Sequence, residues 1–458
     1  MFGKFKEIYF VGIGGSGMSG IAEILHNLGY KISGSDNSPG EATEHLEKIG
    51  VRIYDSHAAA NIGSANVVVI SSAVKENNPE VVEAKRLGIP VIKRAEMLGE
   101  LMRLKYSIGV SGTHGKTTTT SMLGKILADA KMEPTVIVGG IVAGKGSGAE
   151  LGNGEYMVAE ADEYDRSFLK MYPSMAIITN VEPDHLECYD GLEDLENSFV
   201  AYMNKVPFYG QVVYSADDPV LVRLIKNVTR PTISFGLEPG ADYQAVDIID
   251  GEGKSSFSVF YKGDLLGKVH LNVPGEHNVR NALAAIASAC ELEVPFEVAA
   301  ESMSRFVGVA RRFEIKGKIN DIMVVDDYAH HPTEIDATLK TAKKYYNRRL
   351  VVAFQPHLFS RTKMFYKEFA QSLLQADVCL LLDIFPAREI PIEGVTSMLI
   401  EESAVKLGHK QIKTIGPKAN AVVELLKVVR PGDMIITMGA GSITHINPEL
   451  LESLKNVS

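Results

Sequence analysis

A short glycine-rich segment between a predicted strand and a predicted helix constrains this chain more than any other feature. A β-like run that includes Ile108 and Val110 passes into Gly112-Thr-His-Gly-Lys-Thr117, and a helical pattern follows directly. Small residues in such a loop let successive backbone N–H groups point inward at phosphate oxygens, while Lys116 offers a mobile cation and the Thr117 hydroxyl can hold Mg²⁺. The segment therefore predicts a loop that binds the phosphates of a nucleoside triphosphate, which we expect to be ATP.

The loop departs from the usual nucleotide-binding pattern at one position. The pattern GxxxxGK[ST] would have glycine at position 110, where this chain has Val110, so the loop is a short form that begins at Gly112. An ordinary strand-to-helix turn is the alternative, but strand, loop and helix in this order favour phosphate binding. The predicted ATP-binding residues of the loop are Gly112, Thr113, His114, Gly115, Lys116, Thr117 and Thr118.

Length and composition indicate a folded protein of several domains. At 458 residues the chain exceeds what one hydrophobic core usually holds, and 45% apolar with 23% charged residues is typical of an ordered globular protein. The net charge of −10 gives no general attraction to nucleic acids or anionic membranes. The three cysteines lack CxxC spacing, and there is neither a signal peptide nor a run of about 18 apolar residues, so we expect a cytoplasmic protein.

Strand and helix patterns divide the chain into three α/β blocks, each predicted to form a domain. We expect a Rossmann-like N-terminal domain at 1–100, a central P-loop ATPase-like α/β domain at 101–315 and a C-terminal Rossmann-like α/β domain at 316–458. The expected strands lie at 6–11, 31–36, 51–53, 67–71, 90–92, 157–159, 176–179, 322–327, 350–354, 378–383, 412–414 and 434–437, with antiparallel hairpin strands within 255–271 and a helix at 278–290.

The first block begins with a second glycine-rich turn, Gly12-x-Gly14-x-x-Gly17, which opens a helix, and Asp36 ends the next strand. This layout binds the pyrophosphate of a dinucleotide at the helix N-terminus, but a nucleotide-linked substrate such as a UDP-sugar can use it in the same way. A diphosphate-bearing substrate, NAD(P) and a merely structural turn therefore remain open. The candidate binding residues are Gly12, Gly14, Gly15, Ser16, Gly17, Asp36, Ser71 and Ser72.

Polar side chains end two strands of the central block. Glu160 is the first polar residue after an apolar strand, and Asn180-Val-Glu-Pro-Asp-His185 follows the next one. Groups at the carboxyl ends of α/β strands are placed to hold Mg²⁺ over phosphates bound by the preceding loop. A solvated acidic turn and a structural histidine are the alternatives. The predicted metal ligands are Thr117, Glu160 and His185.

Two further polar groups lie near the end of the central block. Asn278 and Asn281 occupy the first turns of a helix, where their amides could satisfy both edges of an adenine, although Asn278 could instead cap the helix. Arg311 and Arg312 are paired cations near the expected domain boundary. One of them could reach a triphosphate, and a plain pair of surface arginines is the alternative.

The third block carries acid, imidazole and guanidinium groups at its first two strand ends. Asp327 and His330-His331 follow one strand, while His357 and Arg361 follow the next. Because the carboxyl ends of parallel strands meet at one edge of a sheet, these groups are predicted to form a site. Arg361 is suited to clamp a carboxylate of a small substrate.

Together these motifs resemble those of the Mur ligases over nearly the whole chain. The pieces that carry the resemblance are Gly12-Ile-Gly-Gly-Ser-Gly-Met-Ser-Gly, Gly112-Thr-His-Gly-Lys-Thr-Thr, Glu160-Ala-Asp-Glu, Asn180-Val-Glu-Pro-Asp-His185, Gly275-Glu-His-Asn-Val-Arg-Asn-Ala, Arg311-Arg-Phe-Glu and Asp327-Tyr-Ala-His-His-Pro. The resemblance implies an ATP-dependent ligase of peptidoglycan synthesis, specifically one that joins L-alanine to UDP-N-acetylmuramate through an acyl phosphate. It implies ATP and Mg²⁺ as cofactors and no nucleic-acid or membrane partner, in a monomer or homodimer.

The resemblance also implies roles for individual residues. Lys116, Glu160, His185 and Arg312 would be catalytic, with Glu160 and His185 on metal ions. ATP would also meet Asn278, Asn281, Arg312 and Asp327, and the amino acid would lie near His330, His331, His357 and Arg361.

Two departures limit this transfer. Sister ligases carry a carbamylated lysine after the metal histidine, whereas 193–204 contains no lysine, and close relatives can carry arginine beside the position of Leu358. A murein tripeptide ligase, an NAD-dependent oxidoreductase and a non-catalytic nucleotide-binding regulator remain rival functions.

Overall fold

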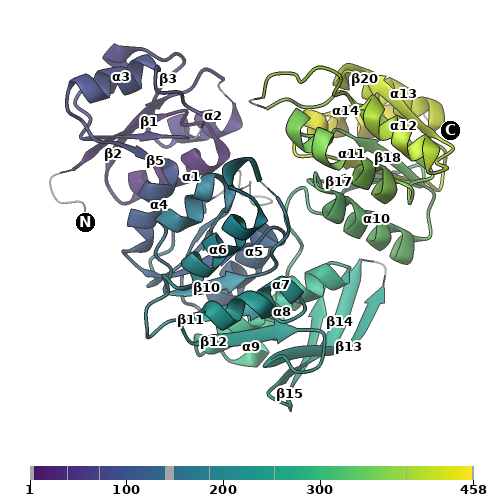
Figure 1. Cartoon of the computed structure of the whole chain (residues 1–458), viewed down its shortest axis with the longest axis horizontal. Coiled ribbons are helices and arrows are strands. Elements are labelled where there is room, and N and C mark those ends of the chain that lie inside the picture. The colour runs from purple at the N-terminus through teal and green to yellow at the C-terminus, as the bar shows by residue number, and fades with distance from the viewer. Residues whose placement is uncertain are drawn as a thin grey trace. The chain divides into compact units, whose positions relative to one another are not determined.

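The structure is a computed structural model that describes residues 5–38, 40–71, 73–139, 149–184, 186–251, 253–387 and 389–455. The chain forms two compact units. The first contains Met1–Ile249 and Ser255–Val307, and the second contains Asp250–Lys254 and Gly308–Ser458. Figure 1 shows three sheets with their helices, coloured from purple through teal to yellow along the chain. No helix in the described ranges is long and apolar enough to cross a membrane.

The N-terminal part of the first unit is a five-stranded parallel sheet in the order β3-β2-β1-β4-β5. Its elements are β1 (Glu7–Val11), α1 (Ser16–Asn27), β2 (Lys31–Ser35), α2 (Glu41–Lys48), β3 (Arg52–Tyr54), η1 (Ala59–Ile62), β4 (Val67–Ile70), α3 (Pro79–Arg86), β5 (Val91–Lys93) and α4 (Arg94–Met102). Alternate residues of β1 enter two different cores, Ile8 and Phe10 in one, Tyr9 and Val11 in the other. Burial on both faces explains the nearly continuous apolar run of this central strand.

The rest of the first unit is a ten-stranded sheet in the order β15-β14-β13-β12-β11-β10-β6-β9-β7-β8. Its elements are β6 (Tyr106–Ser111), α5 (Lys116–Asp129), β7 (Thr135–Ile137), β8 (Ala149–Glu150), β9 (Tyr156–Glu160), η2 (Tyr164–Lys170), β10 (Met175–Ile178), η3 (Leu186–Cys188), α6 (Leu192–Met203), β11 (Gln211–Ser215), α7 (Pro219–Leu224), η4 (Ile225–Asn227), β12 (Thr232–Gly236), β13 (Tyr243–Gly251), β14 (Lys254–Tyr261), β15 (Asp264–Leu271), α8 (Glu276–Glu291) and α9 (Phe296–Ser304). The predicted antiparallel hairpin within 255–271 is confirmed as β14 and β15. Strand β6 lies between β9 and β10 and runs parallel to both, so the loop that follows it opens at the middle of the sheet.

The second unit contains a six-stranded sheet in the order β16-β17-β21-β18-β19-β20, parallel except for the edge strand β16. Its elements are β16 (Glu314–Ile319), β17 (Ile322–Asp327), α10 (Pro332–Tyr346), β18 (Leu350–Phe354), α11 (Phe359–Leu373), β19 (Val378–Leu382), α12 (Met398–Lys406), β20 (Ile412–Gly416), η5 (Lys418–Asn420), α13 (Ala421–Val428), β21 (Met434–Met438), η6 (Ser442–Ile446) and α14 (Asn447–Leu454). The predicted strands of this block are therefore confirmed, and their apolar runs are buried in cores on both faces of the sheet.

Candidate active site

The phosphate loop joins β6 to α5, and two of its positions admit only glycine. Gly112 has a φ of 129° and Gly115 a φ of 85°, a backbone region that favours glycine. A Cβ on Gly112 would lie 2.1 Å from Thr179 Oγ1, and one on Gly115 would lie 2.4 Å from Asn281 Oδ1. The backbone of the loop is therefore packed directly against neighbouring side chains.

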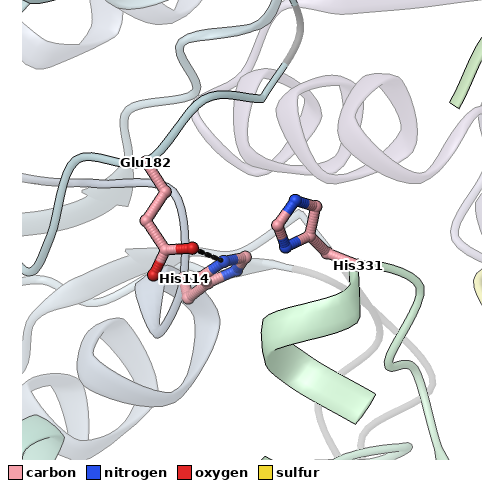
Figure 2. Close-up of side chains that lie close together, drawn as sticks. All are labelled: His114, Glu182 and His331. Carbon is pink, nitrogen blue, oxygen red and sulfur yellow. Dashed lines mark ion pairs between the residues drawn. The ribbon is translucent and has the colours of Figure 1, made fainter. Parts of the chain in front are cut away.

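The segment that follows β10 holds the loop in shape. Asn180 accepts a hydrogen bond from His114 N at 2.8 Å and donates one to His114 O at 3.1 Å. Thr113 Oγ1 accepts from Glu182 N at 2.8 Å. Figure 2 shows the Glu182 carboxylate pointing at the His114 ring. The distance from Glu182 Oε2 to His114 Nε2 is 3.5 Å. His331, which is also drawn there, belongs to the second unit. Asn180 and Glu182 thus support the loop, whereas His185 lies outside the described residues and its metal role stays a prediction.

Lys116 is held at the loop by a carboxylate that the sequence patterns did not single out. Its Nζ lies 2.8 and 3.0 Å from the two carboxylate oxygens of the buried Glu163 and 2.7 Å from Gly112 O. Burial disfavours the ammonium form, but the carboxylates of Glu163, Asp162 and Glu160 outweigh it and raise the pKa of Lys116 above its usual value. Lys116 therefore carries its charge throughout the neutral pH range.

Glu160 provides the observation that tests whether the loop suits a metal ion. It ends β9, the strand next to β6, and its Oε1 is buried without a hydrogen-bond partner among the described residues. Burial raises the pKa of this carboxyl group, while hydrogen bonds from Gly139 N and the Thr117 hydroxyl oppose the rise. A buried carboxylate oxygen without a partner is costly, and Mg²⁺ prefers such oxygen ligands together with a hydroxyl. Thr117 and Glu160 therefore fit a magnesium site.

The two asparagines of α8 make different contacts. The helix is capped by Gly275, so the alternative that Asn278 is its N-cap is wrong; Asn278 instead donates to Pro274 O at 2.8 Å. Asn281 lies against Gly115 of the phosphate loop and accepts a hydrogen bond from Thr119 Oγ1 at 3.4 Å. Helix α8 therefore presents Asn281 directly to the loop, and contact of both asparagines with adenine stays a prediction.

The glycine-rich turn of the N-terminal sheet is held by the end of β2. Ser35 O accepts hydrogen bonds from the backbone N–H groups of Gly12 and Ile13 at 2.8 and 3.0 Å. Asp36 Oδ2 accepts from Gly14 N at 2.8 Å. A Cβ on Gly12 would lie 3.6 Å from Ser71 Oγ, so this predicted residue is also at the turn. Ser72 and the side chain of Ser16 lie outside the described part of the chain.

A buried carboxylate behind this turn was not predicted. Glu80 of α3 is fully buried and accepts hydrogen bonds from Tyr9 Oη and Ser35 Oγ at 2.7 Å and from Asn61 Nδ2 at 2.9 Å. His57 Nδ1 lies 3.1 Å from the same carboxylate. These groups come from three separate segments of chain, so no local pattern could have revealed them. The network holds the serine whose carbonyl binds the turn.

In the second unit, the carboxylate of Asp327 accepts hydrogen bonds from nearby backbone N–H groups. Its carboxylate oxygens accept hydrogen bonds from Ala329 N at 2.7 Å and Phe313 N at 2.8 Å. Burial raises the pKa of this carboxyl group to about 6, an effect that the neighbouring Arg312 guanidinium opposes. The predicted contact of Asp327 with ribose remains a prediction.

Arg311 and Arg312 are not a plain surface pair, so that alternative is wrong. Arg311 Nε lies 3.4 Å from an oxygen of the buried Asp326, and its guanidinium also donates to Gly439 O. Arg312 Nη1 lies 3.3 Å from Glu334 Oε1. Both guanidinium groups stand over the ring of Tyr328, at 4.8 and 5.1 Å from its centroid.

The four residues predicted for amino-acid binding all lie at the carboxyl ends of β17 and β18. His331 caps α10, and His330 Nδ1 lies 3.0 Å from Glu334 Oε2. The rings of His330 and His357 have centroids 6.0 Å apart. Arg361 is buried in the first turn of α11, just after Leu358, which has a φ of 70°. The structure thus gathers these side chains at one edge of one sheet, while their individual roles stay predictions.

This fold and this loop define a multidomain α/β protein of the P-loop type, with further strand-end sites in its flanking sheets. Three family models match in order: "Mur ligase family, catalytic domain" at 7–106, "Mur ligase middle domain" at 110–289 and "Mur ligase, glutamate ligase domain" at 311–441. The chain belongs to the Mur ligase family. The resemblance seen in the sequence motifs is therefore confirmed.

Individual relatives match over the full length. The chain is 50% identical over 455 residues to the UDP-N-acetylmuramate–L-alanine ligase of Geotalea uraniireducens (strain Rf4), covering 99% of each chain. It is similar to the solved UDP-N-acetylmuramate–alanine ligase of Thermotoga maritima, with 31% identity, a TM-score of 0.83 and 98% of each chain covered. The solved murein peptide ligase of Psychrobacter arcticus is 28% identical, with a TM-score of 0.73 and 99% of each chain covered. The predicted three-domain α/β fold is confirmed by these likenesses.

Proposed function

We propose that this chain is an ATP-dependent ligase that joins L-alanine to the lactyl carboxylate of UDP-N-acetylmuramate, giving ADP and phosphate, in peptidoglycan synthesis. The observation that carries the proposal is the buried Glu160 oxygen, which has no hydrogen-bond partner in the described part of the chain and lies with the Thr117 hydroxyl and the charged Lys116 at the glycine-rich loop. The chain is similar over its full length to ligases named for UDP-N-acetylmuramate and alanine, and this similarity supports the choice of substrates.

Each part of the chain has its own task in this proposal. Residues 1–100 bind the UDP-sugar through Gly12, Gly14, Gly15, Ser16, Gly17, Asp36, Ser71 and Ser72. Residues 101–315 bind ATP, and residues 316–458 recognise L-alanine with His330, His331, His357 and Arg361. The protein works in the cytoplasm as a monomer or homodimer, with no nucleic-acid or membrane partner.

The chemistry requires activation because a carboxylate does not react with an amine at neutral pH. A lactyl carboxylate oxygen attacks the γ-phosphorus of ATP, the bond to the β-phosphate oxygen breaks, and ADP leaves. The amine of L-alanine then adds to the acyl carbon of the acyl phosphate and loses a proton. The tetrahedral intermediate expels phosphate with the oxygen that came from the carboxylate, leaving an amide. The overall barrier falls because positioned cations stabilise charge on the transferring group.

The chain supplies these cations and the positioning groups. Lys116 neutralises the β- and γ-phosphates, and Arg312 meets the same phosphates. Bound Mg²⁺ would supply further positive charge at the transferring phosphoryl group, held by Thr117, Glu160 and His185. Asn278 and Asn281 face adenine and Asp327 faces ribose.

The proposal is tested by phosphate release from ATP with purified protein. Release is expected only when UDP-N-acetylmuramate, Mg²⁺ and L-alanine are all present. Parallel reactions replace L-alanine by glycine, by L-serine or by the tripeptide substrate of murein peptide ligases. Faster release with the tripeptide would replace the proposal by the recycling activity, whereas NAD binding without binding of UDP-N-acetylmuramate would indicate an oxidoreductase. ATP binding with no amino-acid-dependent release would indicate a regulator.

A further inference from the structure

Arg94 lies beside the glycine-rich turn of the N-terminal sheet, although no sequence pattern singled it out. It is the first residue of α4 and directly follows the edge strand β5. A Cβ on Gly17 would lie 2.9 Å from Arg94 Nη1 and 3.3 Å from Arg94 Cζ. The guanidinium therefore lies against the second residue of α1, at the N-terminal end of that helix.

Among the described residues, no group accepts a hydrogen bond from this guanidinium. The Arg94 side chain is partly buried, and within the described ranges it makes neither a hydrogen bond nor an ion pair. The preceding Lys93, in contrast, donates to Asp165 at 2.8 Å. Its donors are therefore not used by the described part of the chain, and they are available for charge-assisted hydrogen bonds to an anion.

The helix next to Arg94 carries no acidic residue of its own at its N-terminal end. The first turn of α1 contains only uncharged residues, and its N-cap residue Gly15 provides no side-chain cap hydrogen bond. Backbone N–H groups and the positive end of the helix dipole therefore point out of the N-terminus of α1, where the Arg94 guanidinium also lies. The carboxylate of Asp36 also lies at the turn, where it accepts hydrogen bonds from Gly14 N and Ser38 N.

We propose that Arg94 is a diphosphate-binding residue, whose guanidinium donates to the pyrophosphate oxygens of the UDP-sugar bound at the glycine-rich turn. The inference rests on the proposed function, because that function places a nucleoside diphosphate at this turn. A guanidinium offers donors in a planar fork that matches two phosphate oxygens, which an ammonium group cannot reproduce. Arg94 thus selects diphosphates over uncharged nucleosides and does not touch the reacting carboxylate.

The experiment compares the wild-type protein with Arg94→Met, which keeps the length and apolar stem of the side chain. Isothermal titration is carried out with UDP-N-acetylmuramate, UDP and uridine. Affinity for the two diphosphates is expected to fall roughly 10- to 100-fold, as for loss of charge-assisted hydrogen bonds, while the weak binding of uridine is unchanged. The KM for UDP-N-acetylmuramate is expected to rise by the same factor at constant kcat, and Arg94→Lys is expected to restore part of the affinity.

The matched control is Arg86→Met in the same small domain, where the exposed Arg86 pairs with Glu83 on the surface of α3. This variant is expected to bind all three compounds as the wild type does. Wild-type diphosphate affinity in Arg94→Met would overturn the role of Arg94, and so would an equal loss of uridine and UDP binding, which would show a packing role only. A wild-type protein that binds no UDP-N-acetylmuramate would overturn the proposed function itself.

Discussion

Lys116→Ala is expected to lower kcat by about a thousandfold or more, because in the proposed function its ammonium neutralises the β- and γ-phosphates of ATP. The substitution also leaves Glu163 as a buried carboxylate without its counter-ion. Since Lys116 Nζ lies 2.8 and 3.0 Å from that carboxylate, the variant is expected to lose about 3–5 kcal/mol of unfolding free energy. Urea denaturation and phosphate release measure the two effects separately.

A double variant separates lost chemistry from lost stability. Lys116→Ala with Glu163→Gln removes both buried charges, so it is expected to regain most of the unfolding free energy without regaining turnover. Glu163→Gln alone keeps the ammonium and serves as the matched control. Turnover of Lys116→Ala within about tenfold of the wild type, at full ATP and UDP-sugar occupancy, would contradict the role given to this lysine.

Glu160→Gln is expected to lower kcat by about a thousandfold without lowering the free energy of unfolding. The amide keeps the shape of the side chain but is a poor ligand for Mg²⁺. Burial raises the pKa of Glu160, which means that the charged carboxylate is less favourable in the folded than in the unfolded chain. At neutral pH, above the ordinary pKa, the neutral amide therefore avoids this cost, and the unfolding free energy is expected to stay equal or to rise.

Thermal unfolding with and without Mg²⁺ gives a second measurement that does not depend on activity. Mg²⁺ is expected to raise the melting temperature of the nucleotide-bound wild type and to leave that of Glu160→Gln nearly unchanged. Glu196→Gln is the matched control, because Glu196 is a buried carboxylate on α6 of the same unit that pairs with Arg223 at 2.8 Å. If Mg²⁺ stabilised Glu160→Gln as much as the control, Glu160 would not be a metal ligand.

The sequence was sufficient for the parallel strands of the two flanking sheets and for both glycine-rich turns, because these depend on local patterns, whereas β7, β8, β11, β12, β13 and β16 were not predicted. Buried parallel strands produce uninterrupted apolar runs, and the turns need glycine where a Cβ would collide, as at Gly112 and Gly115. The helix and strand order then limits the topology to doubly wound sheets.

Local sequence patterns could not predict which of several neighbouring polar residues makes a given side-chain contact. Glu163 was one of several carboxylates after β9, and no local pattern distinguished it from Asp162 or Asp165 as the partner of Lys116. The surface alternative stayed open for Arg311 because its acceptor, Gly439 O, lies 128 positions away along the chain. Side-chain partners of this kind are fixed only when distant strands are aligned.

The most direct test of the central claim follows the oxygen atoms. In the proposed function, the phosphate loop transfers a phosphoryl group onto the lactyl carboxylate before the amine reacts. UDP-N-acetylmuramate labelled with ¹⁸O in both lactyl carboxylate oxygens is incubated with the protein, ATP, Mg²⁺ and L-alanine, and the released phosphate is examined by mass spectrometry. The account predicts one ¹⁸O atom in each phosphate and one in each new amide. Unlabelled phosphate released together with the amide product would contradict it.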